Sequence, residues 1–284
     1  MSGTHQYHYL VAGLPDLNYD GLNATIGQAH FLETLKAQCD PSDVELFNWL
    51  FYPQDISRLV QLLMQRPITE PSGSFSADEL NAIIRYEMEA PSFIAQFLEQ
   101  FEADRTAYDE DGWKNVVIAL FYENVNGLQN TFLKDWLLFE RNLKNLIVAF
   151  NARKYEDKPE RSLIIGNEFA NQLISQSSKR DFGLMHDAVP APKVINILEG
   201  KNIVHKEKQL DDLRWQWLDE HTFFHYFSVE RLLAYYIKLG IVERWQKLDK
   251  AHGQTLLDQM IEKFAHEVQL TETDKPQPTY QKTA

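Results

Sequence analysis

The feature that most constrains the fold is a long apolar repeat between residues 129 and 153. Its large apolar side chains recur at intervals of 4, 3, 4, 3 and 4 residues. Because an α-helix has 3.6 residues per turn, this spacing keeps one seam facing a partner helix over several turns. It predicts the longest helix of the molecule. The seam consists of Phe132, Trp136, Phe139, Leu143, Leu146 and Phe150.

Helix start signals occur through much of the remaining chain. Asp40 before Pro41 is typical of an N-cap followed by the first helical residue. Pro53 is expected to open a separate helix, because proline lacks the N–H that a helix interior uses. Ser76 and Glu79 have the spacing of a capping box, in which each side chain accepts a hydrogen bond from the other residue's N–H.

Further helices are expected over residues 161–178, 210–220 and 228–239, with Gly240 as a C-terminal stop. A final helix is expected from Leu257 to Val268. The fold class that follows is all-α, built from several helical bundles.

The helical region is predicted to form one domain over residues 1–268, with a subdomain boundary near the glycine and proline breakers of 181–193. Its start, His5 to Asp16, is either a short extended segment or the irregular beginning of a helix. Residues 269–284 are polar and contain two prolines, so a disordered tail is expected.

The composition indicates a cytoplasmic protein. The single cysteine, Cys39, cannot form an internal disulfide. No apolar run reaches the roughly 18 residues that span a bilayer.

Residues 1–133 carry 6 Lys and Arg against 19 Asp and Glu, whereas residues 134–284 carry 22 of each. This acidic first half argues against nucleic-acid binding, which requires a basic surface.

Candidate metal chemistry is sparse. His221 and His225 have the i, i+4 spacing of zinc ligands on a helix, but the intervening Phe223 and Phe224 favour structural histidines at a buried junction. His186 and Asp187, with His205, Asp211 and Asp212, offer an alternative: a helical metal-dependent phosphohydrolase. A loop is the simpler interpretation of the His186-Asp187 segment. No phosphate-binding glycine motif occurs, so nucleotide binding has no support. We also expect no cofactor, metal or catalytic residue.

Two similar segments concentrate tryptophan and arginine, the residue types that most often anchor protein interfaces. The segment RWQWLD begins at Arg214, and RWQKLD begins at Arg244. The residues that follow do not align, so these segments are not a true repeat. Their side chains are core residues or interface residues, and the candidate interface set is Arg214, Trp215, Trp217, Arg244 and Trp245.

Three blocks resemble a bacterial family of unknown function that is associated with V-type ATPase genes. They are HYLVAGLPD from His8, FERNLKN from Phe139 with FNAR from Phe150, and LLAYYIKL from Leu232 continuing as IVERW to Trp245. That family is similar to the rotor-coupling protein of V-type ATPases, which is designated by the letter C in bacteria and archaea and by d in eukaryotes. The resemblance covers most of residues 5–268.

The resemblance implies a funnel-like, all-helical protein without a catalytic site. Such a protein joins the central shaft to the membrane rotor ring and transmits torque during proton or sodium transport. Its partners would be the shaft subunits and the ring. It would lie on the cytoplasmic face of the inner membrane and be held there by protein contacts alone. A generic helical scaffold with no link to an ATPase is the other alternative.

Overall fold

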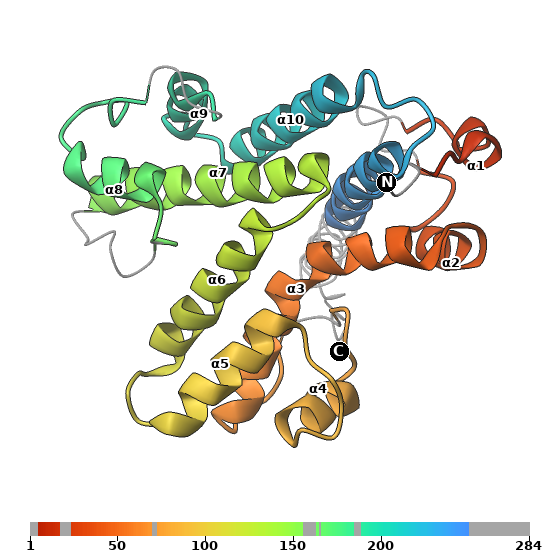
Figure 1. Ribbon diagram of the computed structural model, residues 1–284. Helices are drawn as coiled ribbons and strands as arrows, with labels where there is room; N and C mark the ends of the chain where they lie inside the picture. Colours follow the sequence, from red (N-terminus) through yellow and green to blue (C-terminus); the bar gives the residue numbers. More distant parts are fainter. Residues whose placement is uncertain are drawn as a thin grey trace, which may run out of the picture. The chain divides into compact units, whose positions relative to one another are not determined.

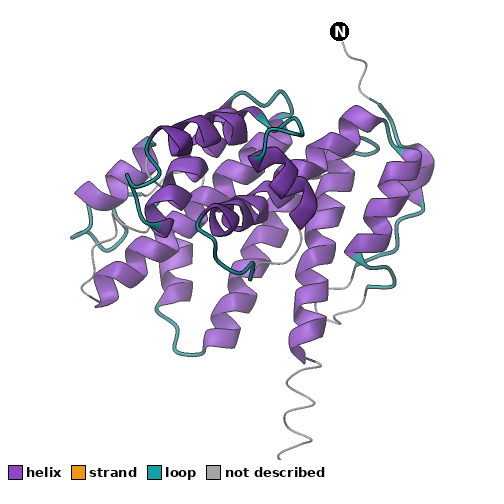
Figure 2. Cartoon of the chain, turned by 90° about the horizontal axis from the view of Figure 1, so that it is seen from below, coloured by secondary structure: helices purple, strands orange, loops and turns teal. Residues whose placement is uncertain are grey.

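The computed structural model describes residues 5–17, 24–69, 73–155, 163–164, 166–184 and 189–249, and in these residues it contains helices and loops but no strand. Figure 2 shows this all-helical construction, which confirms the predicted fold class. The helices labelled in Figure 1 are α1 (His8–Ala12), α2 (Gln28–Gln38), α3 (Pro41–Leu63), α4 (Ala77–Ile84), α5 (Ser92–Ala103), α6 (Glu110–Asn126), α7 (Thr131–Tyr155), α8 (Glu168–Ser175), α9 (Ala191–Leu198) and α10 (Ile203–Thr222). An unlabelled helix over residues 229–249 follows them.

The chain divides into two compact units. One contains residues 1–12 and 34–234, and the other contains residues 13–33 and 235–284. Single-domain organisation over 1–268 and a boundary within 181–193 stay predictions. The expected helix at 257–268 and the tail at 269–284 lie outside the described residues.

In the larger unit, the sequence signals for two helix starts are confirmed. Asp40 caps α3 by accepting a hydrogen bond from the Ser42 N–H at 2.9 Å. Ser76 and Glu79 form both hydrogen bonds of the capping box that opens α4. Each pair satisfies N–H groups that the first turn of a helix leaves without intrahelical partners.

The expectation that Pro53 opens a separate helix is wrong. α3 runs without a break from Pro41 to Leu63, with Pro53 in its interior. Buried residues flank the proline on both sides, including Tyr52 and Ile56. Tertiary packing of this apolar face therefore compensates for the backbone hydrogen bond that proline removes.

Edge-to-face aromatic contacts join α3, α5 and α6. The ring of Phe93 lies 5.3 Å from that of Tyr52 and 5.4 Å from that of Phe121. Beside this core, the buried Asp55 carboxylate binds Arg58 and accepts hydrogen bonds from the Ser74 and Phe75 N–H groups. A Cβ at Gly73 would lie 2.1 Å from an Asp55 oxygen, so glycine allows this loop to approach α3.

α7 confirms the predicted seam, because all six seam residues are buried. The helix contacts α6, α8 and α9, and in Figure 1 α6 runs diagonally away from one end of it. Asn145, which is also buried, fixes the segment after α7 through two hydrogen bonds to the Ile164 backbone, each 2.9 Å long.

In the smaller unit, the expectation that Gly240 ends its helix is wrong, since the helix continues to residue 249. A Cβ at Gly240 would lie 2.4 Å from Gln28 Nε2. The Gln28 N–H donates to Glu243 Oε1, and its side chain donates to the Tyr236 carbonyl oxygen. Gly240 therefore permits close packing of the first residues of α2.

Candidate functional site

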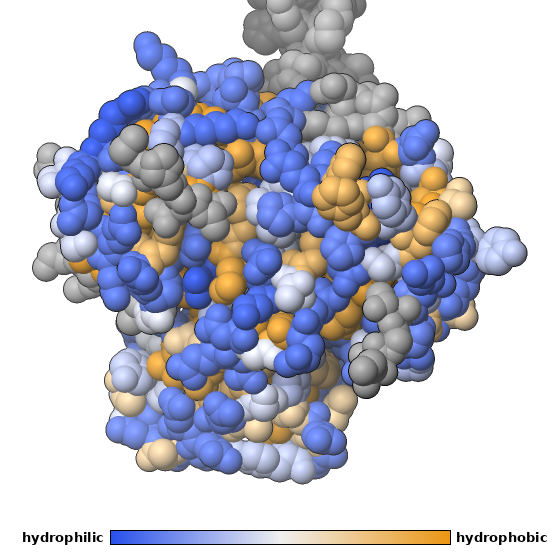
Figure 3. Space-filling model, turned by 45° about the horizontal axis from the view of Figure 1, so that its top comes forward, coloured by the Kyte–Doolittle hydropathy of each residue, from blue (hydrophilic) through white to orange (hydrophobic). Residues whose placement is uncertain are grey.

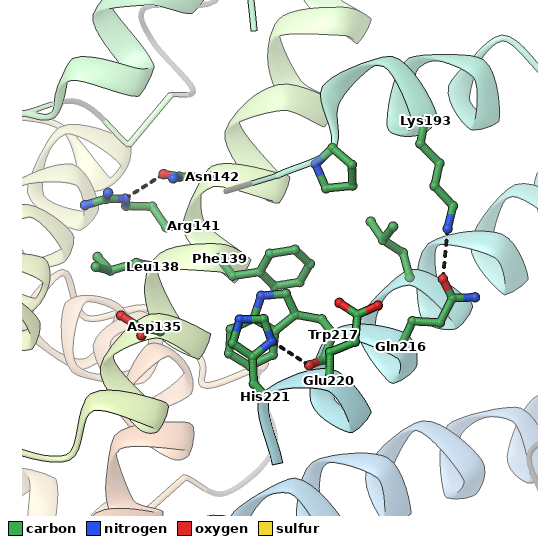
Figure 4. A pocket seen from close by; sticks show the side chains of 12 residues that line it. Asp135, Leu138, Phe139, Arg141, Asn142, Lys193, Gln216, Trp217, Glu220 and His221 are labelled. Carbon is green, nitrogen blue, oxygen red and sulfur yellow. Dashed lines mark hydrogen bonds between the residues drawn. The ribbon is translucent and has the colours of Figure 1, made fainter. Parts of the chain in front are cut away.

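A cavity of about 720 Å³ opens between α7, α9 and α10 in the larger unit. Its walls combine aromatic rings with charges of both signs, and they include a residue from the candidate interface set. Figure 4 shows Phe139, Trp217 and His221 at its centre. The lining residues are Asp135, Leu138, Phe139, Arg141, Asn142, Pro190, Lys193, Leu213, Gln216, Trp217, Glu220 and His221.

Trp217 is the structural centre of this site. It projects from α10 onto the first half of the α7 seam, where its ring centroid lies 5.8 Å from that of Phe132 and 5.3 Å from those of Trp136 and Phe139. Only 9% of its surface is exposed. The side chain therefore packs as a core residue whose remaining edge reaches the cavity.

His221 covers the other face of Trp217. The two rings are nearly parallel, with centroids 3.7 Å apart, and His221 Nδ1 lies 2.8 Å from the Trp217 carbonyl oxygen. These contacts hold the imidazole against Trp217 in the wall of the cavity.

Arg214 connects α10 to α7 beside the cavity. Its guanidinium binds Glu140 at 2.7 Å and the buried Asp211 at 3.1 Å. Burial tends to lower the pKa of Arg214, but the two carboxylates outweigh burial and hold that pKa above its usual value. The ion pairs therefore keep a cation between two long helices.

A second arginine lies on the α7 wall. Burial lowers the pKa of Arg141, although its proximity to Tyr122 opposes this effect. Its guanidinium lies over the Tyr122 ring at 5.2 Å, and its Nε donates to Asn142. On the opposite wall, Lys193 Nζ donates to Gln216 Oε1 at 2.9 Å (Figure 4).

The candidate interface residues have different environments. Arg214, Trp215 and Trp217 all lie on α10, where Trp217 is buried and the other two are partly exposed. Arg244 and Trp245 belong to the smaller unit, where the Arg244 guanidinium lies 5.9 Å from the Trp245 ring centroid. The structure explains Arg214 and Trp217 as packing residues, and an interface role for the set stays a prediction.

The expectation of a buried junction around His221 and His225 is wrong. α10 ends at Thr222, so the two histidines do not share a helix face. Phe223 and Phe224 are 64% and 80% exposed. The sequence predicted a helix ending near Glu220, but it did not show that the phenylalanines after this end are exposed.

The alternative metal site is only partly within the described residues. His186 and Asp187 lie outside them, His205 is exposed on the first turn of α10, and Asp211 binds Arg214. Within the described part of the chain, no three His, Cys, Asp or Glu side chains are close enough together to hold a metal ion.

Comparison with known proteins gives a family without an assigned activity. No curated protein and no solved structure matches the sequence at a significant level. One family model matches residues 4–268, which is nearly the whole chain. The chain therefore belongs to the family described as "Protein of unknown function (DUF2764)".

Proposed function

We propose that this protein is a non-catalytic central-stalk component of a V-type ATPase, which couples the soluble shaft to the membrane rotor ring. The observation that carries the proposal is the resemblance of three sequence blocks to a family similar to the rotor-coupling protein of these ATPases. Two of these blocks, separated by more than 200 residues, meet in the smaller unit. There the Tyr235 hydroxyl donates to the Pro15 carbonyl oxygen at 3.0 Å.

Rigid helix junctions support a mechanical role. A protein that transmits torque must resist displacement of its helices, and closely packed side chains provide this resistance. Trp217 packs against three successive seam residues of α7, and Arg214 pairs with Glu140 on the same helix. The α7–α10 junction thus combines apolar packing with a directional ion pair.

Attachment through other proteins of the complex fits the described helices. Among the residues that the structure describes, no helix has the length and apolar character needed to cross a bilayer. In the proposed complex, contacts with the ring and shaft subunits hold the protein at the membrane.

Native purification tests this proposal. We expect the tagged full-length protein, extracted with its membranes in mild detergent, to recover V-type ATPase shaft and ring subunits in stoichiometric amounts. Membrane vesicles from cells lacking the protein should hydrolyse ATP but build little ion gradient, and the wild-type gene should restore coupling. Failure to recover any part of a rotary ATPase, with unchanged ion pumping, would leave the generic helical scaffold.

Metal analysis tests the enzymatic alternative separately. The coupler requires no bound metal for its role. A stoichiometric transition metal in the purified protein that is lost on His186→Ala substitution would contradict the coupler and favour a phosphohydrolase.

A further inference from the structure

Several aromatic residues that do not pack in the α7–α10 junction lie just beyond the end of α10. Phe223, Phe224, Tyr226 and Phe227 are 64%, 80%, 63% and 37% exposed, and Tyr9 of α1 is 96% exposed. We refer to these five residues as the aromatic patch. Figure 3 shows orange apolar side chains interrupting a mostly hydrophilic surface on one face of the molecule. Within the described residues, all the exposed phenylalanines belong to this patch.

Backbone and ring contacts hold the two segments of the patch together. The Tyr7 N–H donates to the Phe227 carbonyl oxygen at 2.6 Å, and the His8 ring lies 4.3 Å from the Phe227 ring. Phe223 and Phe224 pack edge to face with centroids 4.9 Å apart. The exposed rings therefore occupy a defined surface, which reduces the entropy lost when a partner binds.

Exposure of these rings has an energetic consequence. Burying a phenylalanine side chain that was in water stabilises a complex, because apolar surface is removed from water. Isolated exposed apolar residues are normal on protein surfaces, but a contiguous group often marks a binding site. Phe223 and Phe224 pack on each other, and the Phe227 segment is bound to the start of α1, so these exposed rings form a surface that gains from being covered.

The charges around the patch select the kind of partner. Asp43 accepts a hydrogen bond from the Tyr7 hydroxyl at 2.5 Å and binds His5, which also contacts Asp40. The last turns of α10 expose Asp219 and Glu220.

On the other side of the loop, Glu230 lies 3.5 Å from His225. Arg231 follows Glu230, and its guanidinium donates to the Thr222 hydroxyl oxygen. Within the described segments 5–9, 40–43 and 219–231, five carboxylates thus accompany one guanidinium.

We propose that the aromatic patch docks a basic amphipathic helix of a partner protein. The apolar side of such a helix covers the phenylalanines, and its lysines or arginines meet the carboxylates and the aromatic faces, which attract cations. An anionic membrane surface would be repelled by the same carboxylates. A second copy of this chain, with its net charge of −13, is electrostatically unfavourable.

Site-specific photocrosslinking in the native cells tests this proposal on the full chain. A photoreactive phenylalanine analogue replaces Phe224, and in a matched control it replaces Ile203, which is 71% exposed at the opposite end of α10. We expect a crosslink from position 224 to a protein segment with an apolar helical face and net positive charge, and no such crosslink from position 203. Phe223→Ser should reduce the yield by about 10-fold, as loss of an interface anchor does. Val204→Ser should leave it unchanged.

Other results would overturn the proposal: a lipid adduct, a crosslink to a second copy, a crosslinked segment of neutral or negative charge, or a yield no higher than at position 203. The identity of the crosslinked partner tests the proposed function separately from the docking surface. A basic helix from a protein outside any rotary ATPase would support this docking surface and contradict the proposed function, whereas a rotary ATPase partner contacted elsewhere would do the reverse.

Discussion

Two aromatic groups lie within ten residues of each other on and after α10, and they have opposite environments. Trp217 is buried against the α7 seam, whereas Phe223 and Phe224 are exposed to solvent. Since all three side chains are large and aromatic, their hydrophobic character alone does not show which of them is buried. The difference shows that the end of a helix, rather than its hydrophobicity, decides which aromatic residue is core and which is available for binding.

The position of this helix end has a direct effect on Phe224. Phe224 follows Trp217 by seven residues, so a helix that continued to Phe224 would place the two side chains on nearly the same face. α10 instead ends at Thr222, whose hydroxyl donates to the Leu218 carbonyl oxygen at 2.6 Å, while the His225 N–H bonds to the Thr222 carbonyl oxygen. The turn takes Phe224 off the buried stripe.

The largest effect on folding is expected from truncating the buried member of the comparison. Trp217→Ala removes the ring that packs on Phe132, Trp136 and Phe139, and it should lower the free energy of unfolding by about 3–5 kcal/mol. Denaturant titration would measure this loss. Trp217→Phe, the matched control, should lose less because it keeps a ring. A loss below about 1 kcal/mol for Trp217→Ala would show that α10 is not fixed by this residue.

A smaller loss is expected at the ion pairs of the same junction. Arg214→Met leaves the buried Asp211 without its guanidinium partner and should lower the free energy of unfolding by about 2 kcal/mol, below the range for a fully buried pair. Glu140→Gln should cost less than about 1 kcal/mol, since Glu140 is partly exposed and the amide oxygen still accepts a hydrogen bond. Equal losses in thermal unfolding would contradict this asymmetry.

The second tryptophan segment provides an intermediate case. Trp245 is partly exposed, and its ring lies beside the Arg244 guanidinium. Trp245→Ala should therefore lower the free energy of unfolding by about 1–2 kcal/mol, less than Trp217→Ala, because less apolar surface leaves a buried environment. If chemical denaturation gave equal losses, the two segments would be equivalent core elements. An unchanged stability with loss of partner capture would instead place Trp245 in an interface.

The sequence predicted the fold class and the α7 seam because periodic spacing reports directly which side of a helix is buried. It predicted the caps at Asp40 and Ser76 because local hydrogen bonds form them. It did not predict the continuous helix through Pro53, since packing on both sides of the proline overrides its local preference.

Long-range contacts explain what else the sequence did not show. Gly240 has the residue type of a helix stop, but it allows approach of Gln28, which is more than 200 residues away. The candidate site had one signal in the sequence: the clustering of tryptophan and arginine from Arg214. That signal marked part of α10, although it could not show that Trp217 faces α7 or that the neighbouring phenylalanines lie outside the core.

The smallest effect on folding is expected for the exposed member of the comparison. Phe223→Ser combined with Phe224→Ser should change the free energy of unfolding by less than about 0.5 kcal/mol, because both rings are already largely in water. Ile203→Ser with Val204→Ser, also exposed on α10, is the matched control and should behave alike in the same denaturant titration. A loss comparable to that of Trp217→Ala would mean that the aromatic patch is covered in solution by part of this chain. Unchanged stability would establish that these phenylalanines are not needed for folding, and it would make the double variant suitable for testing partner binding without disturbing the helices beneath.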